Sequence, residues 1–358
     1  MPLDQRPLDQ TKLDDFLGKA VSDLSAGYGG VMVSLGNKLG LYKAMAGGGP
    51  LTPAEVAGRC GCAARYVEEW LNAQVAGGYL DYHPASGCYE LPPEKAYVLA
   101  DDQSPVFIPA AWDVPASMWF DEAQAVAAFR SGEGVPWGDH HERLYCGVAS
   151  FYRNAYKGSL VQDWLPTLEG ATAKLARGAR VADVGCGHGH STVLMADAFP
   201  KSRFWGYDGH ADSIAAARQV AADAGVADRV RFEQTDARSY AEKGFDLICF
   251  FDCLHDMGHP VAAAQHAREA LAPGGTVMLV EPFAEDRVED NATPVGRLYY
   301  AASTTLCCAH ALSEKGSHAL GAQAGEARLA EVFRAAGFGH FRRAHQTPFN
   351  LVLEARVS

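Results

Sequence analysis

The feature that most constrains the fold is a regular alternation of predicted strands and helices from about residue 171 onward. The predicted strands cover residues 180–184, 202–207, 230–234, 245–251 and 276–281. The helices between them include residues 191–198, 214–224 and 260–271. Strands separated by helical segments connect through parallel crossovers, which predicts a Rossmann-like, doubly wound α/β sheet.

Two further strands are predicted in the C-terminal tail, at residues 338–345 and 349–357. The connection between them is too short for a crossover, so these two strands must pair antiparallel. The sheet is therefore expected to be mostly parallel, with one antiparallel pair contributed by the end of the chain.

Three glycines follow the first predicted strand at alternate positions, Gly185, Gly187 and Gly189. Because they lack a Cβ, they let a ligand approach the backbone closely. Asp208 ends the second strand, 19 residues beyond Gly189. That spacing is typical of the acidic residue that binds ribose hydroxyls in nucleoside sites. Ligands of open parallel sheets bind at the carboxyl ends of the strands, so we expect a cofactor there.

A dinucleotide-binding dehydrogenase is the main rival interpretation of this glycine loop. The dinucleotide fingerprint needs a third glycine for close packing between helix and strand. His190 stands at that place, and an imidazole does not replace a glycine. The residues therefore disfavour a dinucleotide cofactor.

The pattern G-x-G-x-G after Val-Ala-Asp-Val resembles motif I of the class I S-adenosylmethionine (SAM)-dependent methyltransferases. Asp236 and Ala237 resemble the pair that meets the adenine amino group in that family, and Pro273-Gly274-Gly275 resembles its turn before the fifth strand. The resemblance implies an enzyme that uses SAM and releases S-adenosylhomocysteine. The expected cofactor residues are Asp183, Gly185, Gly187, Gly189, Asp208, Gly209, Asp236, Ala237, Phe251 and Asp252.

Asp183 lies inside the first predicted strand, where an unpaired buried carboxylate would be costly. We expect it to bind amides of the glycine loop or the amino end of the cofactor. Asn154 and Tyr156, which precede this domain, are expected to close over the cofactor.

A candidate base follows the fourth predicted strand. An acceptor hydroxyl must lose its proton during methyl transfer, and a histidine suits that task because its pKa lies near neutral pH. The segment Leu254-His255-Asp256 resembles that of the two-domain small-molecule O-methyltransferases of plants and bacteria. In that family the histidine deprotonates the acceptor, which implies this role for His255. Glu281 matches an acidic residue that orients the histidine.

The match to that family is incomplete at a second acidic position. The corresponding place holds Gln323, with Glu326 about a turn later, and the segment Leu306–His310 has no counterpart in the family. We expect the acceptor to lie among His255, Tyr299, Tyr300, Cys308 and the aromatic residues of the segment 105–170.

Three other functions remain open at this point. A small-molecule S- or N-methyltransferase would need less base catalysis, because a thiolate or free amine is already nucleophilic. A methyltransferase of proteins or nucleic acids would need an open, charged groove. A SAM-binding regulator without turnover would use its N-terminal domain to bind DNA.

The N-terminal residues have the outline of a winged helix: a helix within 31–45, two helices from Pro53 and Ala64, and a hairpin over 79–91. Thr52, Pro53 and Glu55 form a predicted helix start. Residues 1–100 hold eight Lys or Arg against eleven Asp or Glu, and the whole chain has a net charge of −12. That sign disfavours a nucleic-acid partner, and the family resemblance implies a homodimer through this domain.

We divide the chain into a winged-helix domain (1–105), a helical connector (106–170) and a SAM-binding domain (171–358). The nine cysteines are odd in number and scattered, which favours reduced thiols in a cytoplasmic protein. No secretory signal or membrane span is expected from the sequence. No His or Cys group has the spacing of a metal site, so we assign no metal.

Overall fold

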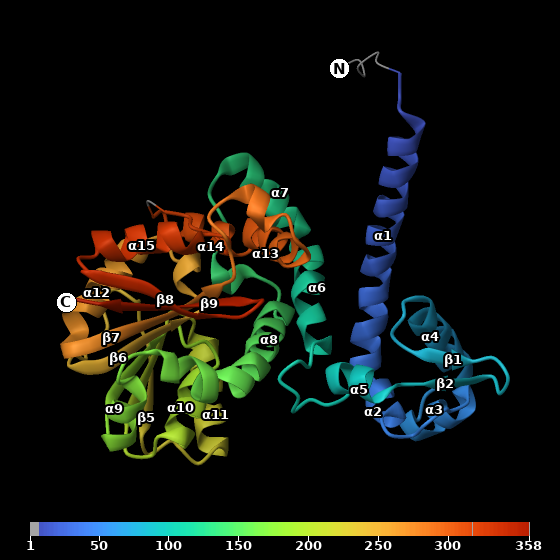
Figure 1. Ribbon diagram of the computed structural model, residues 1–358, viewed down its shortest axis with the longest axis horizontal. Helices are drawn as coiled ribbons and strands as arrows, with labels where there is room; N and C mark the ends of the chain where they lie inside the picture. Colours follow the sequence, from blue (N-terminus) through green and yellow to red (C-terminus); the bar gives the residue numbers. More distant parts are fainter. Residues whose placement is uncertain (1–6, 317, 358) are drawn as a thin grey trace. The chain divides into compact units, whose positions relative to one another are not determined.

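The computed structural model describes residues 7–316 and 318–357, which form two compact units, Met1–Asp113 and Val114–Ser358 (Figure 1). Most of the predicted connector falls within the second unit. The first six residues of the predicted N-terminal domain lie outside the described residues. The predicted boundaries at residues 105 and 170 stay predictions.

The first unit is a winged helix preceded by a long helix, so this part of the predicted fold is confirmed. A single helix runs from residue 10 to residue 38, much longer than the helix predicted within 31–45, and it ends before Gly40, whose φ is 70°. The elements are α1 (Gln10–Lys38), α2 (Leu41–Met45), α3 (Pro53–Cys60), α4 (Ala64–Ala76), β1 (Asp81–His83), β2 (Cys88–Glu90), α5 (Pro93–Leu99) and η1 (Pro109–Trp112).

The start of α3 is set by a capping box, as the sequence predicts. The Thr52 hydroxyl accepts from the Glu55 backbone N–H at 3.3 Å, and the Glu55 carboxylate accepts from the Thr52 N–H at 2.8 Å. This reciprocal pair satisfies two backbone donors that the first helical turn leaves free. The helix then buries Val56 and Ala57 in the core of the unit.

The second unit begins with a series of helices and short helical turns that leads into the sheet. They are α6 (Asp113–Phe120), α7 (Glu122–Ser131), η2 (Trp137–Asp139), α8 (Arg143–Ser159), η3 (Leu160–Trp164), η4 (Leu165–Thr167) and α9 (Ala171–Arg177). The long helix α8 has a strongly one-sided pattern of apolar residues, and it buries Leu144, Gly147, Asn154 and Tyr156.

A seven-stranded sheet forms the centre of this unit, in the order β5-β4-β3-β6-β7-β9-β8. The first five strands in this order pair in parallel, and β9 and β8 add an antiparallel pair. The predicted fold class is confirmed. The strands are β3 (Arg180–Val184), β4 (Arg203–Asp208), β5 (Val230–Gln234), β6 (Phe245–Phe251), β7 (Leu271–Pro282), β8 (His340–Gln346) and β9 (Asn350–Arg356).

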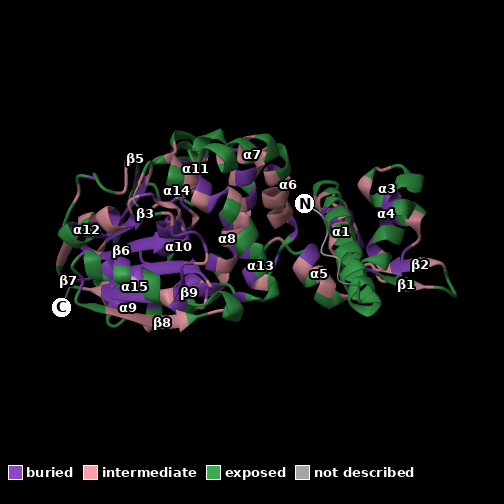
Figure 2. Cartoon of the chain, turned by 90° about the horizontal axis from the view of Figure 1, so that it is seen from above, coloured by how far each residue is buried: buried purple, intermediate pink, exposed green. Residues whose placement is uncertain are grey.

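Helices cover both faces of the sheet (Figure 1). One face packs against α9, α10 (His190–Ala198) and α11 (Ala211–Asp223), and the other packs against α12 (Pro260–Ala270) and α15 (Gly325–Ala335). Figure 2 shows the central strands as buried along most of their length. The remaining elements are η5 (Leu254–Asp256), η6 (Val288–Asn291), α13 (Pro294–Thr305) and α14 (Cys307–Ser313).

The strand order reverses around β3, which has β4 on one side and β6 on the other. At such a reversal the connections leave on opposite faces of the sheet, and a crevice opens beyond the carboxyl ends of the strands. The glycine loop after β3 and Asp208 at the end of β4 both lie at this edge. The fold thus brings the glycine loop and Asp208 to one place.

Gly189 offers a test of how tightly this loop packs. Its φ is 73°, and an added Cβ would lie 2.6 Å from the Phe232 ring and 2.9 Å from Ala217 Cβ. We expect Gly189→Ala to lower the free energy of unfolding by about 2–4 kcal/mol, from backbone strain and overpacking together. Urea denaturation followed by circular dichroism measures this loss.

Gly225→Ala is the matched control, because Gly225 has a φ of 69° with no atom within 4 Å of an added Cβ. It carries only the backbone strain, so its loss is expected to be roughly 1–2 kcal/mol. Equal losses in the two variants would contradict the packing argument.

Candidate functional site

The glycine loop turns the chain sharply from β3 into α10. Gly185, Gly187 and Gly189 have φ values of 75°, 51° and 73°, a region that favours glycine. An added Cβ at Gly185 would lie 2.6 Å from Cys253 Sγ, whereas at Gly187 nothing lies within 4 Å. The middle of the loop is therefore open to a ligand, while its two ends are packed against the protein.

Asp208 holds this loop in place. One of its carboxylate oxygens accepts from the Gly187 N–H at 2.9 Å, and the other accepts from the His210 N–H at 2.8 Å. An ionised carboxylate can accept about four hydrogen bonds, so the hydroxyls of a ribose can still bind. The neighbouring Gly209 also faces open space.

Asp183 is buried beneath the loop. Its Oδ2 accepts from the Ser191 and Thr192 hydroxyls, both at 2.6 Å. These hydroxyls belong to the first turn of α10, and burial raises the pKa of Asp183 to about 6. Among the described residues its Oδ1 has no hydrogen-bond partner. Asp183 thus keeps one buried oxygen that can accept a further hydrogen bond, and its contact with a cofactor stays a prediction.

Helix α8 is fixed to the ends of two strands. The Tyr156 hydroxyl donates to Asp252 Oδ2 at 2.8 Å, and the Asn350 amide donates to Asp252 Oδ1 at 3.0 Å. Asp252 has a φ of 50°, unusual for a residue other than glycine, and burial raises its pKa well above the ordinary value. The preceding Phe251 packs against the Tyr156 ring, with ring centroids 5.5 Å apart. Asn154, also on α8, is buried, and its Nδ2 has no partner among the described residues.

Asp236 and Ala237 follow β5, at the adenine end predicted from the sequence. Asp236 Oδ1 accepts from the Arg238 backbone N–H at 2.8 Å and from Arg238 Nε at 2.7 Å. These hydrogen bonds with Arg238 lower the pKa of Asp236 despite its partial burial. Arg238 is therefore the structural partner of this carboxylate, and the contact of Asp236 and Ala237 with an adenine stays a prediction.

The two histidines of the loop, His188 and His190, are half-buried. Burial lowers the pKa of His190 to about 4, and the charges of Arg153, His188 and Lys157 add to that effect. His190 is therefore neutral near pH 7, at the first position of α10.

His255 lies between two carboxylates. Its Nδ1 is hydrogen-bonded to Glu281 Oε2, and Glu281 Oε1 also accepts from the Leu254 N–H at 3.1 Å. On the other side of the ring, Nε2 lies 3.1 Å from Asp256 Oδ1. His255 and Glu281 are only 3% and 2% exposed. The structure thus brings Glu281 to the histidine, at the atom from which it can orient the ring.

The charges around His255 set its protonation. Burial alone would lower the pKa of this histidine, but Asp256 and Glu281 outweigh burial and raise the pKa well above its usual range. The second carboxylate is Asp256, which the sequence did not single out.

Gln323, at the place matched to the family, donates to the Phe283 carbonyl, and Glu326 pairs with Arg343 at 2.7 Å. Neither Gln323 nor Glu326 contacts His255.

The expected acceptor residues differ in burial and in their contacts. Tyr299 is buried, and its hydroxyl donates to the Phe349 carbonyl at 2.9 Å. Tyr300, the next residue of α13, is 37% exposed. The Cys308 thiol lies 3.5 Å from the Ser303 hydroxyl. Cys307, the neighbour of Cys308, lies beside His255. The sequence pointed to it only through the segment Leu306–His310, which has no counterpart in the family.

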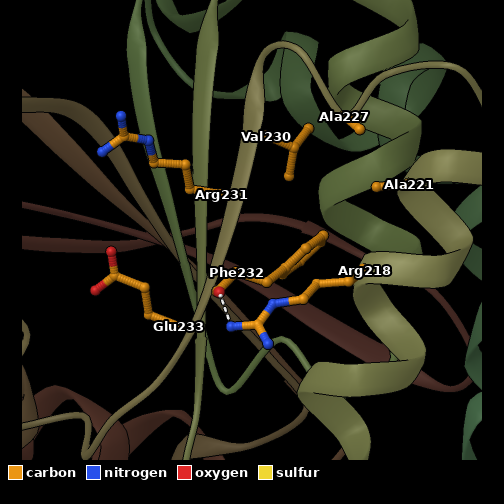
Figure 3. Close-up of a pocket in the computed structure, with 7 residues that line it drawn as sticks. All are labelled: Arg218, Ala221, Ala227, Val230, Arg231, Phe232 and Glu233. Carbon is orange, nitrogen blue, oxygen red and sulfur yellow. Dashed lines mark hydrogen bonds between the residues drawn. The ribbon is translucent and has the colours of Figure 1, made fainter.

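A separate hollow lies between α11 and the edge strand β5 (Figure 3). Arg218 reaches across it and donates to the Phe232 carbonyl at 2.8 Å. The lining residues are Arg218, Ala221, Ala227, Val230, Arg231, Phe232 and Glu233. None of the predicted site residues is among them, so this hollow is not the predicted cofactor site.

Comparison with known families matches both units. Residues 27–101 match the Rv2258c-like winged helix-turn-helix domain, and residues 175–337 match a methyltransferase domain. The first unit is thus similar to a winged helix-turn-helix domain and the second to a methyltransferase domain, in the order found in two-domain class I methyltransferases.

Similar proteins of known structure have the same fold over nearly the whole chain. An O-methyltransferase family protein from Burkholderia thailandensis superposes with a TM-score of 0.70 at 19% identity, covering 96% of this chain and 98% of that one. Human N-acetylserotonin methyltransferase in complex with SAM gives a TM-score of 0.69 at 16% identity, covering 99% and 100%. At these identities the likeness concerns the fold.

Curated relatives match a shorter region. Trans-aconitate 2-methyltransferase of Streptomyces coelicolor is 36% identical over 104 residues, which is 29% of this chain and 34% of the relative. The 27-O-demethylrifamycin SV methyltransferase of Amycolatopsis mediterranei is 32% identical over 125 residues, covering 32% and 46%. The chain thus spans less than half the length of these relatives.

Proposed function

We propose that this protein is a SAM-dependent methyltransferase that acts on a small molecule. The observation that carries the proposal is the loop at Gly187, which is open to a ligand and tied to Asp208 within a matched methyltransferase domain. The buried free oxygen of Asp183 supports the same cofactor, because it can accept from an ammonium group. The relatives are named as methyltransferases of small molecules.

The cofactor supplies an electrophilic methyl group on a sulfonium, which is a good leaving group. The protein then has to bind and orient the acceptor. Asp208 and the glycine loop would hold the nucleoside, while Asp183 and Asn154 would meet the amino-acid end. Apolar side chains around Tyr299 and Cys307 exclude water near His255.

We propose a hydroxyl acceptor with His255 as its base. Glu281 accepts a hydrogen bond from Nδ1–H, so Nε2 is the nitrogen at which a proton would be exchanged. Because Asp256 and Glu281 raise the pKa of His255, the ring has to give up its Nε2 proton before it can act as a base. In the structure Nε2 faces Asp256 at 3.1 Å. The acceptor hydroxyl therefore has to take the place of Asp256 at this nitrogen before His255 can act as a base.

The contact between Nε2 and Asp256 also favours a second candidate function. An S- or N-methyltransferase of a small thiol or amine would not need this nitrogen, because its acceptor is already nucleophilic. His255 would then stay between its two carboxylates and only shape the pocket. The two candidates differ in how far turnover depends on the imidazole.

Turnover of a panel of phenols, thiols, amines and carboxylic acids separates these candidates, with S-adenosylhomocysteine release as the readout. For a phenol, we expect His255→Ala to lower kcat by about 10²–10⁴-fold, the usual contribution of a general base. His340→Ala, at an exposed histidine of the edge strand β8, is the control and should turn over normally. A thiol or amine that is methylated equally well by His255→Ala would refute the hydroxyl proposal.

We also propose a homodimer formed through α1. Six apolar side chains of this helix recur at alternating spacings of four and three residues, and all are at least 41% exposed (Figure 2). This is the pattern of a coiled-coil seam, which becomes buried when a second helix packs against it. The residues are Leu17, Val21, Leu24, Tyr28, Val31 and Leu35.

Charged substitutions in the seam test the dimer. We expect sedimentation velocity to give a dimer for the wild type and a monomer for the double variant Leu17→Glu/Leu24→Glu, because buried unpaired carboxylates are costly. Ser22→Glu places the same charge opposite the seam, at an exposed position two turns before the buried Gly30, and should leave the dimer intact. A monomeric wild type, or a dimer that persists in the double variant, would show that the seam does not join two copies.

A cytoplasmic protein without a nucleic-acid partner fits the remaining observations. All nine cysteines are free thiols, as expected in a reducing compartment. In α4, the helix that would enter a DNA groove, Arg65 pairs with Glu69 at 2.5 Å, and this acid would compete with a phosphate for the arginine. Among the described residues, none of the helices has the length and apolarity to cross a membrane.

A further inference from the structure

We propose that His255, Asp256 and Cys307 bind a divalent transition-metal ion such as Zn²⁺. Their potential ligand atoms all lie within 4.8 Å of one another. His255 and Asp256 come from η5 and Cys307 comes from the start of α14. Within residues 7–316 and 318–357, no other group of His, Cys, Asp and Glu side chains has this arrangement.

The donor set fits zinc. Imidazole nitrogen, cysteine sulfur and carboxylate oxygen are the three ligand types that zinc takes in proteins, and sites with three protein ligands keep a fourth position open. With bonds of 2.0–2.3 Å, tetrahedral donors lie roughly 3.3–3.8 Å apart. Nε2 and Asp256 Oδ1 are already 3.1 Å apart, and all three donor atoms lie within 4.8 Å of one another, so the side chains would have to close by about 1 Å at most around an ion.

Glu281 gives this site a further feature of metal centres. A histidine that binds a metal nearly always donates its other ring N–H to a carboxylate or carbonyl, which fixes the ring. His255 Nδ1 is hydrogen-bonded to Glu281, and Glu281 is itself fixed by the Leu254 N–H. Nε2 is therefore held toward Asp256 and Cys307, the two other ligands.

The surroundings also favour a bound ion. His255, Glu281 and Cys307 are each less than a tenth exposed. Buried in this way, the cluster holds two carboxylates beside a single imidazole. A dication between Nε2, the Asp256 carboxylate and the Cys307 sulfur places positive charge where the negative charges converge.

Metal binding would also affect turnover. This effect rests on the proposed function, whereas the metal site itself does not. The ion and the proton of an acceptor hydroxyl compete for the same nitrogen, His255 Nε2. Zn²⁺ should therefore inhibit methylation of a hydroxyl, and a chelator should restore it. The cluster would make the enzyme sensitive to free zinc.

Titration of the metal-free, full-length protein with Co²⁺ tests the site, since Co²⁺ takes zinc sites and reports on its ligands by absorption. We expect one equivalent to bind, with a sulfur-to-cobalt charge-transfer band in the near ultraviolet and the visible bands of a four-coordinate ion. Cys307→Ala and Cys307→Ser should lose the charge-transfer band. Glu281→Gln should keep the band and weaken binding by about 10–100-fold.

Cys308→Ala is the matched control for metal binding. Cys308 is the next residue on α14, but its thiol contacts Ser303, so its replacement should leave the cobalt spectrum unchanged. Circular dichroism checks that each variant is folded. Loss of the charge-transfer band in Cys308→Ala but not in folded Cys307→Ser would overturn the assignment, as would a wild-type protein that binds no Co²⁺ or binds it without the band.

The turnover measurement keeps the two proposals apart. If Co²⁺ binds as expected and no acceptor is methylated, the metal site stands and the proposed function fails. If methylation occurs and Zn²⁺ inhibits the wild type at least ten times more strongly than Cys307→Ser, both stand. Methylation that Zn²⁺ inhibits equally in both proteins would overturn the competition at Nε2.

Discussion

The hydrogen bond between the Gly187 N–H and the Asp208 carboxylate is the interaction on which the site depends. It joins the ends of two adjacent parallel strands, β3 and β4, at the point where the strand order reverses. Parallel pairing places both strand ends at the same edge, and the positive φ of Gly187 turns its N–H toward the carboxylate. The carboxyl edge of the sheet thereby carries the open backbone of Gly187 beside the Asp208 carboxylate.

A second constraint is the burial of carboxylates along the same edge. Asp183, Asp252 and Glu281 are all almost fully buried, and each has its own hydrogen-bond donors. Burying such groups is costly without partners, and the structure supplies these partners from hydroxyls, an amide and an imidazole. Under the proposed function, these carboxylates would recognise a charged cofactor and an acceptor, which a purely apolar edge could not do.

Much of this arrangement could be predicted from the sequence, because it depends on local patterns. The strands of the sheet, the antiparallel tail and the capping box at Thr52 follow from periodicity and from side-chain chemistry within a few residues. The grouping of Gly187 and Asp208 follows from the rule that strand ends meet at one edge. These features need no knowledge of how distant segments pack.

The rest could not be predicted, because it depends on contacts between distant segments. Tyr156 reaches Asp252 from α8, and Cys307 reaches His255 from α14. Nothing in the local sequence indicates these partners. Asp256 was visible beside His255 in the sequence, yet only the fold shows that its carboxylate faces Nε2 rather than solvent.

Isothermal titration calorimetry with SAM tests the central claim most directly, with wild type, Asp208→Ala and Asp223→Ala compared. Asp223 is an exposed residue of α11 and serves as the control. The account predicts that wild type and Asp223→Ala bind one SAM per chain with equal affinity. It predicts that Asp208→Ala binds SAM about 100-fold more weakly, because the two hydrogen bonds from the ribose hydroxyls to the Asp208 carboxylate are lost. A wild type that does not bind SAM, or an Asp208→Ala variant that binds it normally, would contradict the account.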